Sequence, residues 1–215
     1  MLAWRGRGAD KKLDREASAY HKKYLERKAL YKSFGYDVDE ERGFILKQAE
    51  PVFGKILEAG TGKGHFALAL AKAGHSFVTF DISLEEQRFA KLNITHFGFQ
   101  EQVGFRIENG EKTSFPEGNF DVIFSVNVLH HLRHPYQVID EFIRLLSPKG
   151  KIILADFTEE GLKIMDKIHG LEGNTHEVGE VGLADAEKYL IKNGFSVKNA
   201  QSAYQSVLIA GKKQP

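Results

Sequence analysis

Residues 56–64 read Ile-Leu-Glu-Ala-Gly-Thr-Gly-Lys-Gly, and this stretch decides the fold class. A short apolar run is followed by glycines at every second position. In residues 64–73, directly after it, apolar side chains recur in a helical pattern. The stretch therefore predicts a strand, a tight glycine loop and a helix N-terminus, where backbone N–H groups favour the electron-rich groups of a ligand.

Glycine loops at this position serve two kinds of ligand. Dinucleotide-binding loops follow G-x-G-x-x-G, whereas here Gly64 comes one residue early and His65 stands where the pattern requires glycine. Glu58 would repel a pyrophosphate but suits a ligand with an amino group or a sulfonium. Asp81 is expected to end the next strand, where its carboxylate can accept hydrogen bonds from both ribose hydroxyls.

The chain on either side of the loop alternates short apolar runs with amphipathic stretches, as βαβ units do. The predicted parallel strands are 55–59, 77–80, 103–107, 120–126 and 151–156, and strands 195–201 and 204–211 are expected to form an antiparallel hairpin. Helices are predicted over 10–32, 39–50, 64–73, 135–146, 162–168 and 183–192, and from Ser83, which with Glu86 forms a capping box. Residues 148–150, Pro-Lys-Gly, are expected to turn the chain before the fifth strand.

Composition narrows the function classes. The 30 basic and 29 acidic side chains nearly balance, which argues against a dedicated nucleic-acid-binding protein. Residues 1–32 hold ten basic and four acidic side chains, which fits either a solvated helix or a contact with an anionic partner. There is no cysteine, so disulfides and thiolate chemistry are excluded. No apolar run reaches the ~18 residues of a membrane span and no signal-peptide core is present, so we expect a cytoplasmic protein without a membrane span.

The motifs in order resemble those of class I S-adenosylmethionine-dependent methyltransferases. The resemblance runs from about residue 54 to 157 and rests on the acidic-x-Gly-x-Gly-x-Gly loop at Glu58–Gly64, on Asp81, on Asn109–Gly110–Glu111 followed by 115–121, and on the turn at 145–150. The branch that looks most similar includes quinone-biosynthesis C-methyltransferases and many small-molecule enzymes. Many relatives have Asp at the position of Asn109, whereas the quinone branch resembles this chain in having Asn there.

The resemblance implies a Rossmann-like doubly wound α/β sheet of five parallel strands plus the C-terminal antiparallel hairpin, seven strands in all, with helices on both faces. It implies a helical cap or lid over residues 1–50 and an S-adenosylmethionine-binding methyltransferase domain over 51–215. The residues implied to contact the methionine portion of this cofactor are Glu58, Gly60, Gly62, Ser125 and Val126. Those implied to contact the nucleoside are Asp81 on the ribose and Ile82, Asn109 and Gly110 on the adenine.

The segment after the fourth strand is expected to face the methyl acceptor, because ligands of α/β folds lie at the carboxyl ends of the strands. The candidates are Asn127, His130 and His131. His130 is the weak candidate for a general base, which is required only if the acceptor must lose a proton, and a structural role is the alternative. His169, Glu172, His176 and Glu177 could form a metal or metalloid site, but their spacing matches no standard motif, so we predict a polar loop and no metal.

We therefore predict an enzyme that transfers a methyl group to a small-molecule acceptor by in-line displacement, without a nucleic-acid partner. The alternatives are a non-catalytic S-adenosylmethionine-binding or regulatory protein and a nicotinamide-dependent oxidoreductase, which the position of Gly64 opposes. The sequence sets neither the acceptor nor the oligomeric state.

Overall fold

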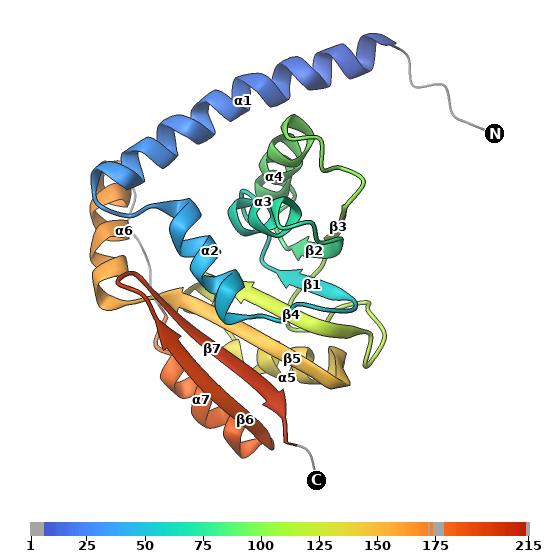
Figure 1. Cartoon of the computed structure of the whole chain (residues 1–215), viewed down its shortest axis with the longest axis vertical. Helices are drawn as coiled ribbons and strands as arrows, with labels where there is room; N and C mark the ends of the chain where they lie inside the picture. The colour runs from blue at the N-terminus through green and yellow to red at the C-terminus, as the bar shows by residue number, and fades with distance from the viewer. Residues whose placement is uncertain (1–6, 172, 174–178, 214–215) are drawn as a thin grey trace, which may run out of the picture.

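A seven-stranded sheet forms the centre of the computed structural model, which describes residues 7–171, 173 and 179–213 (Figure 1). The strand order is β3-β2-β1-β4-β5-β7-β6. The first five strands are parallel, and β7 pairs antiparallel with both β5 and β6, which confirms the predicted sheet. The strands are β1 (Ile56–Ala59), β2 (Phe77–Asp81), β3 (Val103–Ile107), β4 (Phe120–Val126), β5 (Leu146–Phe157), β6 (Phe195–Gln201) and β7 (Gln205–Lys212).

Helices cover both faces of the sheet and enclose two apolar cores. The helices are α1 (Arg7–Ser33), α2 (Val38–Gln48), α3 (His65–Lys72), α4 (Leu84–His96), α5 (Pro135–Leu145), α6 (Glu159–Leu171) and α7 (Leu183–Lys192), with the short 3-10 helix η1 (Leu129–His131). On one face α2, α3 and α4 bury apolar side chains against the sheet, and on the other face α5 and α7 do so. The sheet is therefore doubly wound, as predicted.

The winding direction reverses at β1, which pairs with β2 on one side and with β4 on the other. Every residue of β1 is buried, as are most of β4, because helices cover both faces. The loops that leave the carboxyl ends of these two strands run in opposite directions and open a crevice between them, the usual ligand site of this fold.

The turn predicted at Pro148–Gly150 lies inside β5, which begins at Leu146 and not at residue 151. Phe120 pairs with Leu146 and Val122 pairs with Lys151, so four residues of β5 lie opposite the single residue Asp121. This bulge accommodates Pro148 without a ladder hydrogen bond. A side chain on Gly150 would come within 2.8 Å of the Asp121 carbonyl oxygen, so glycine is required there.

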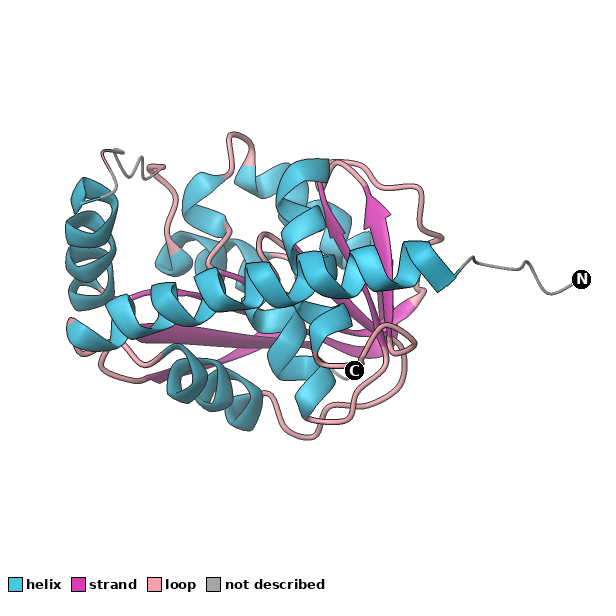
Figure 2. Cartoon of the chain, turned by 90° about the horizontal axis from the view of Figure 1, so that it is seen from above, coloured by secondary structure: helices cyan, strands magenta, loops and turns pink. Residues whose placement is uncertain are grey.

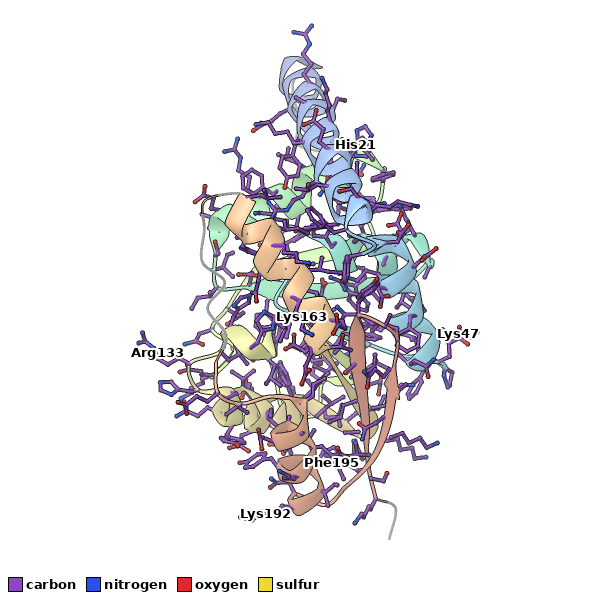
Figure 3. All side chains as sticks on the ribbon, turned by 90° about the vertical axis from the view of Figure 1, so that its left-hand side faces the viewer. His21, Lys47, Arg133, Lys163, Lys192 and Phe195 are labelled. Carbon is purple, nitrogen blue, oxygen red and sulfur yellow. The ribbon has the colours of Figure 1, made fainter. Side chains whose placement is uncertain are left out.

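Helix α1 crosses α4 and ends beside α6 (Figure 2). The Tyr20 ring stacks on Phe89 of α4, and Glu16 pairs with Arg88. At the other end, Tyr31 packs in a third apolar cluster with Met165 and other residues of α6. Figure 3, which looks at the molecule from the side of α6, shows α6, marked by Lys163, below α1, marked by His21. No helix in the described part of the chain is long and apolar enough to cross a bilayer.

Two further helix predictions can be compared with the structure. Ser83 caps α4, because its hydroxyl accepts a hydrogen bond from the Glu86 N–H at 3.2 Å. The predicted capping box is only half formed, because the Ser83 N–H donates to Asp81 and not to Glu86. Helix α6 spans 13 residues, more than the predicted 162–168.

Of the residues considered as a metal site, Glu172, His176 and Glu177 lie outside the described residues.

Candidate functional site

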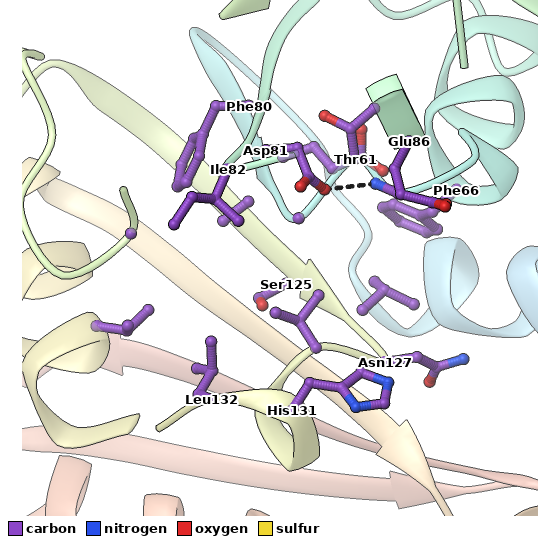
Figure 4. A pocket seen from close by; sticks show the side chains of 18 of the residues that line it. Thr61, Phe66, Phe80, Asp81, Ile82, Glu86, Ser125, Asn127, His131 and Leu132 are labelled. Carbon is purple, nitrogen blue, oxygen red and sulfur yellow. Dashed lines mark hydrogen bonds between the residues drawn. The ribbon is translucent and has the colours of Figure 1, made fainter. Parts of the chain in front are cut away.

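A cavity of about 630 Å³ opens at the carboxyl ends of β1, β2 and β4 (Figure 4). The predicted substrate-facing residues Asn127 and His131 line it, and His130 does not. The predicted cofactor contacts all line it: Glu58, Gly60, Gly62, Asp81, Ile82, Asn109, Gly110, Ser125 and Val126. The fold thus brings together residues that are far apart in the sequence, although the role of each one remains a prediction.

The glycine loop needs glycine at position 60 for a steric reason. The φ angle of Gly60 is +86°, and a Cβ there would come within 2.3 Å of the Val128 side chain. The N–H groups of Gly60 and Thr61 both donate to the Phe80 carbonyl oxygen, at 2.9 and 3.0 Å. The loop is therefore fastened to the end of β2 and lies close to the segment after β4, so that its backbone forms the floor of the cavity.

Asp81 joins the glycine loop to the start of α4. One carboxylate oxygen accepts a hydrogen bond from the Gly62 N–H at 2.7 Å (Figure 4). The other accepts from the Ser83 N–H at 2.8 Å. Each oxygen retains capacity to accept a further hydrogen bond from a ligand hydroxyl. Ile82 is 72% exposed and lines the same cavity, so its apolar side chain is open to a ligand bound there.

Glu58 acts from beneath the loop. Its carboxyl group accepts a hydrogen bond from the Thr79 hydroxyl at 2.6 Å, and the Thr79 and Thr61 hydroxyl oxygens lie 2.6 Å apart. Burial raises the pKa of Glu58 to about 8, against the effect of the hydrogen bonds from Thr79 and the Ala67 N–H. Glu58 therefore orients the loop, and a cationic ligand above it would favour its ionised form.

The loop between β3 and β4 forms the far wall, and α5 holds it in place. The N–H and hydroxyl of Thr113 donate to Glu141 at 2.8 and 2.6 Å, and Glu141 also pairs with Arg144. Burial alone would raise the pKa of Glu141, but the hydrogen bonds from Arg144 and Thr113 lower it to about 2. Asn109 forms a local turn, since its side-chain oxygen accepts from the Glu111 N–H at 3.0 Å.

Asn127 is held in a strained conformation with its amide group unsatisfied. Its φ angle is +56°, rare for a residue other than glycine, and its backbone N–H donates to the Ala155 carbonyl oxygen at 2.8 Å. Both polar atoms of its side chain are buried without a hydrogen-bond partner among the described residues. Buried polar atoms in such a state indicate a place where a ligand or water supplies the missing partner.

His131 lies on the opposite side of the cavity from Asp81 (Figure 4), and behind it are a second histidine and an acid. The ring Nδ1 atom of buried His130 lies 2.6 Å from one carboxylate oxygen of Asp156. The backbone N–H of His130 donates to the other carboxylate oxygen at 3.2 Å. The rings of His130 and His131 lie 3.9 Å apart between centroids. The predicted base candidate His130 therefore sits behind His131, and the His131 ring is the one that lines the cavity.

Four cationic or potentially cationic residues of the cavity wall were not expected as ligand contacts: Arg42, Lys63, His65 and Arg133. The Nε atom of Arg42 and the Nδ1 atom of His65 are buried without a partner in the part of the chain that the structure describes. Burial lowers the pKa of His65 to about 3, so its ring is neutral. Arg42 belongs to no motif, whereas the departure of His65 from the dinucleotide pattern was a signal that could have marked it.

Among the residues that the structure describes, no group of three or more His, Asp or Glu side chains is arranged to hold a metal ion.

Comparisons with known proteins bear on this site. The family described as Methyltransferase domain matches residues 57–154. The chain is 27% identical over 161 residues to 27-O-demethylrifamycin SV methyltransferase of Amycolatopsis mediterranei, covering 70% of this chain and 57% of that protein. It is 27% identical over 150 residues to ubiquinone biosynthesis O-methyltransferase of Escherichia coli, covering 69% and 61%. The chain thus spans less than two thirds of these relatives. The second is named as an O-methyltransferase and the first by its acceptor, 27-O-demethylrifamycin SV, whereas the branch noted above includes C-methyltransferases.

A solved structure extends the likeness to the fold. Magnesium protoporphyrin IX methyltransferase of Synechocystis, crystallised with bound S-adenosylhomocysteine, superposes with a TM-score of 0.59 and 24% identity over 82% of each chain. The matched residues include the glycine loop. This loop lines the cavity and follows β1, the strand at which the winding direction of the sheet reverses. The family match over residues 57–154 and the two named relatives support a place for this domain in the class I S-adenosylmethionine-dependent methyltransferase superfamily, with S-adenosylmethionine as its cofactor.

Proposed function

We propose that the chain transfers the methyl group of S-adenosylmethionine to a hydroxyl oxygen of a small-molecule acceptor. The proposal rests on one observation. The glycine loop and Asp81 are joined by a 2.7 Å hydrogen bond on the wall of a 630 Å³ cavity, at the place where the winding direction of the sheet reverses. The two named relatives support the acceptor class, because one is named for the acceptor 27-O-demethylrifamycin SV and the other is named ubiquinone biosynthesis O-methyltransferase.

The residues of the cavity fit this cofactor. Asp81 has lone pairs for two ribose hydroxyls, and exposed Ile82 offers an apolar surface to a planar base. Arg42 has a buried Nε atom without a partner, which suits a carboxylate such as that of methionine. Asn109 and Gly110 would contact the adenine edge, and Ser125 and Val126 the methionine portion.

The bound cofactor supplies an activated methyl group on a sulfonium, so the protein has to align the acceptor and exclude water. A hydroxyl acceptor must also lose its proton, and we assign the base to His131, because its ring lines the cavity. His130 and Asp156 act as positioning residues: the 2.6 Å contact orients the His130 ring, on which His131 rests. Asn127 holds the start of η1 against β5 through its backbone hydrogen bond.

The test is production of S-adenosylhomocysteine from S-adenosylmethionine with a panel of phenols, catechols and hydroxynaphthoates. We expect stoichiometric formation of a methyl ether with at least one acceptor class. A chain that binds S-adenosylhomocysteine but methylates no member of the panel would support the non-catalytic alternative. Binding of NAD without binding of S-adenosylmethionine would contradict the whole proposal.

A further inference from the structure

The 630 Å³ cavity at the ends of β1, β2 and β4 is called the cofactor cavity below. A second cavity, of about 440 Å³, lies beneath α1 and adjoins it. One wall is formed by α1, and the other by residues of the glycine loop, α3 and α4. Lys63 and His65 line both cavities. We refer to this second space as the α1 cavity.

The partition between the two cavities is rigid. Gly64 has a φ angle of +81°, and a Cβ there would come within 2.7 Å of Ala90 on α4. The Asn93 side chain of α4 donates to the Lys63 carbonyl oxygen at 3.2 Å. The turn is thus pinned against α4, and the side chains of Lys63 and His65 on either side of Gly64 are presented to both spaces.

Aromatic rings form the walls of the α1 cavity. Tyr20 stacks on Phe89, with 4.7 Å between the ring centroids and 11° between the planes, and Tyr24 stacks on His65 at 5.2 Å and 27°. Burial raises the pKa of Tyr20 to about 12, so its hydroxyl is neutral and can donate a hydrogen bond. Walls of this kind favour a flat, aromatic ligand.

The charge of the α1 cavity is positive. Lys23, Arg27 and Lys63 line it, against the single acid Glu26. Arg27 donates through Nε to the Tyr31 hydroxyl at 2.8 Å, which fixes its position. A cavity lined by several cations attracts an anionic ligand.

His65 adds a polar atom that a ligand can satisfy. Its Nδ1 atom is buried and has no partner among the residues that the structure describes, although its ring is stacked on Tyr24. Because His65 lies on the partition, a ligand in the α1 cavity that reaches this atom is also at the entrance to the cofactor cavity.

We propose that the α1 cavity binds the aromatic ring and the carboxylate of the methyl acceptor, so that the acceptors are hydroxylated aromatic acids. The inference rests on the proposed function and names its substrate class. The acceptor's ring packs between the stacked pairs, its carboxylate lies near Lys23 and Arg27, and its hydroxyl passes Lys63 and His65 toward the cofactor. A volume of 440 Å³ holds a molecule of one or two rings.

The first test measures binding of 2-naphthoate and of its neutral counterpart 2-naphthylmethanol to the chain saturated with S-adenosylhomocysteine, by calorimetry at 0.15 M salt, where long-range charge effects are screened. We expect naphthoate to bind at least tenfold more tightly than the alcohol. K23E should weaken naphthoate binding tenfold or more. K22E is the matched control, since Lys22 is exposed on the same helix and does not line the cavity; it should change binding less than twofold.

Equal affinity for the acid and the alcohol, or equal effects of K23E and K22E, would overturn the inference. The second test is methylation of hydroxy-2-naphthoates against 2-naphthol, where we expect K23E to raise KM for the acids without changing kcat. If naphthoate binds but no hydroxynaphthoate is methylated while 2-naphthol is, the cavity does not hold the acceptor. Failure of the proposed function is distinguishable, because the chain would then not bind S-adenosylhomocysteine or would methylate nothing.

Discussion

Asp81 combines a structural and a ligand-binding position in one carboxylate. It accepts the Gly62 and Ser83 N–H groups and lines the cofactor cavity. We expect Asp81→Ala to weaken binding of S-adenosylmethionine, because each hydrogen bond to a charged group contributes roughly 1.5–3 kcal/mol. Calorimetric titration measures the loss. Glu85→Ala, an exposed acid in the first turn of α4, is the control, and an affinity unchanged by Asp81→Ala would remove this residue from the site.

Glu58 makes stability depend on pH in a direction opposite to that of an acid whose pKa is lowered on folding. Burial raises its pKa to about 8, so the folded state retains a proton that the unfolded state loses, and stability falls as pH rises toward 8. His65, with a pKa lowered to about 3, acts only below pH 6.5, where stability falls as pH decreases.

Between pH 6.5 and 8.5 the effect of Glu58 is therefore separable. We expect the free energy of unfolding in urea to decrease across this range in the wild type and to decrease less in Glu58→Gln. Glu101→Gln, at an exposed position, should follow the wild type. Parallel curves for all three proteins would show that Glu58 is ionised in the fold.

His131 carries the proposed base function. Replacing it with alanine should lower kcat by about 10²–10⁴, the usual contribution of general base catalysis, and should leave the affinity for S-adenosylhomocysteine within about threefold. His134→Ala, a neighbouring exposed histidine outside the cavity, is the control. Steady-state kinetics with a phenolic acceptor measure kcat for both variants. Full activity in His131→Ala would mean that the acceptor reacts without this base.

The sequence predicted the residues on the cavity floor because they lie in a contiguous motif or directly follow a strand. Gly60, Asp81 and Asn127 are of this kind. Arg42 could not be predicted, since it reaches the cavity only after α2 packs on α3. His130 lies behind His131 because its ring contacts Asp156 of β5. A single sequence does not reveal this contact.

At the level of elements, the loop between β3 and β4 depends on α5. Glu141 accepts two hydrogen bonds from Thr113 and pairs with Arg144 three residues on. We expect Glu141→Gln to reduce the free energy of unfolding by about 1.5–3 kcal/mol at pH 7. Because the pKa of Glu141 is lowered to about 2, this difference should narrow as the pH falls from 4.5 toward 2.

A matched control exists in Glu160, which also pairs with a cation three residues later but is exposed. Glu160→Gln should change stability by less than about 0.5 kcal/mol. Urea denaturation measures both variants. Equal effects would show that the hydrogen bonds to Thr113 add nothing to the ion pair with Arg144.

The predicted ranges 183–192 and 120–126 match the bounds of α7 and β4, because the pattern of apolar side chains is clear in both segments. The start of β5 was not predicted, because Pro148 and Gly150 are ordinary turn residues and only the pairing with β4 turns them into a bulge. The path of α1 was beyond the sequence as well: its polar composition fits a solvated helix, and its contacts with α4 and α6 are tertiary.

At the scale of the whole molecule, the strand order places the ends of β1 and β4 on either side of one crevice, and every predicted cofactor contact lies in it. Helix α1 then adds a second, positively charged cavity beside the first. The doubly wound sheet could be predicted from the alternation of strands and helices, whereas the acceptor side could not, because α1 builds it from residues without a motif.

A crystal structure of the chain with saturating S-adenosylhomocysteine would show whether the cavity at the ends of β1, β2 and β4 is the cofactor site. We expect the nucleoside in this 630 Å³ cavity, with the ribose hydroxyls within about 3 Å of the Asp81 carboxylate and the methionine portion along Gly60–Gly62. A nucleoside bound at any other place, or a glycine loop without ligand at saturation, would contradict it.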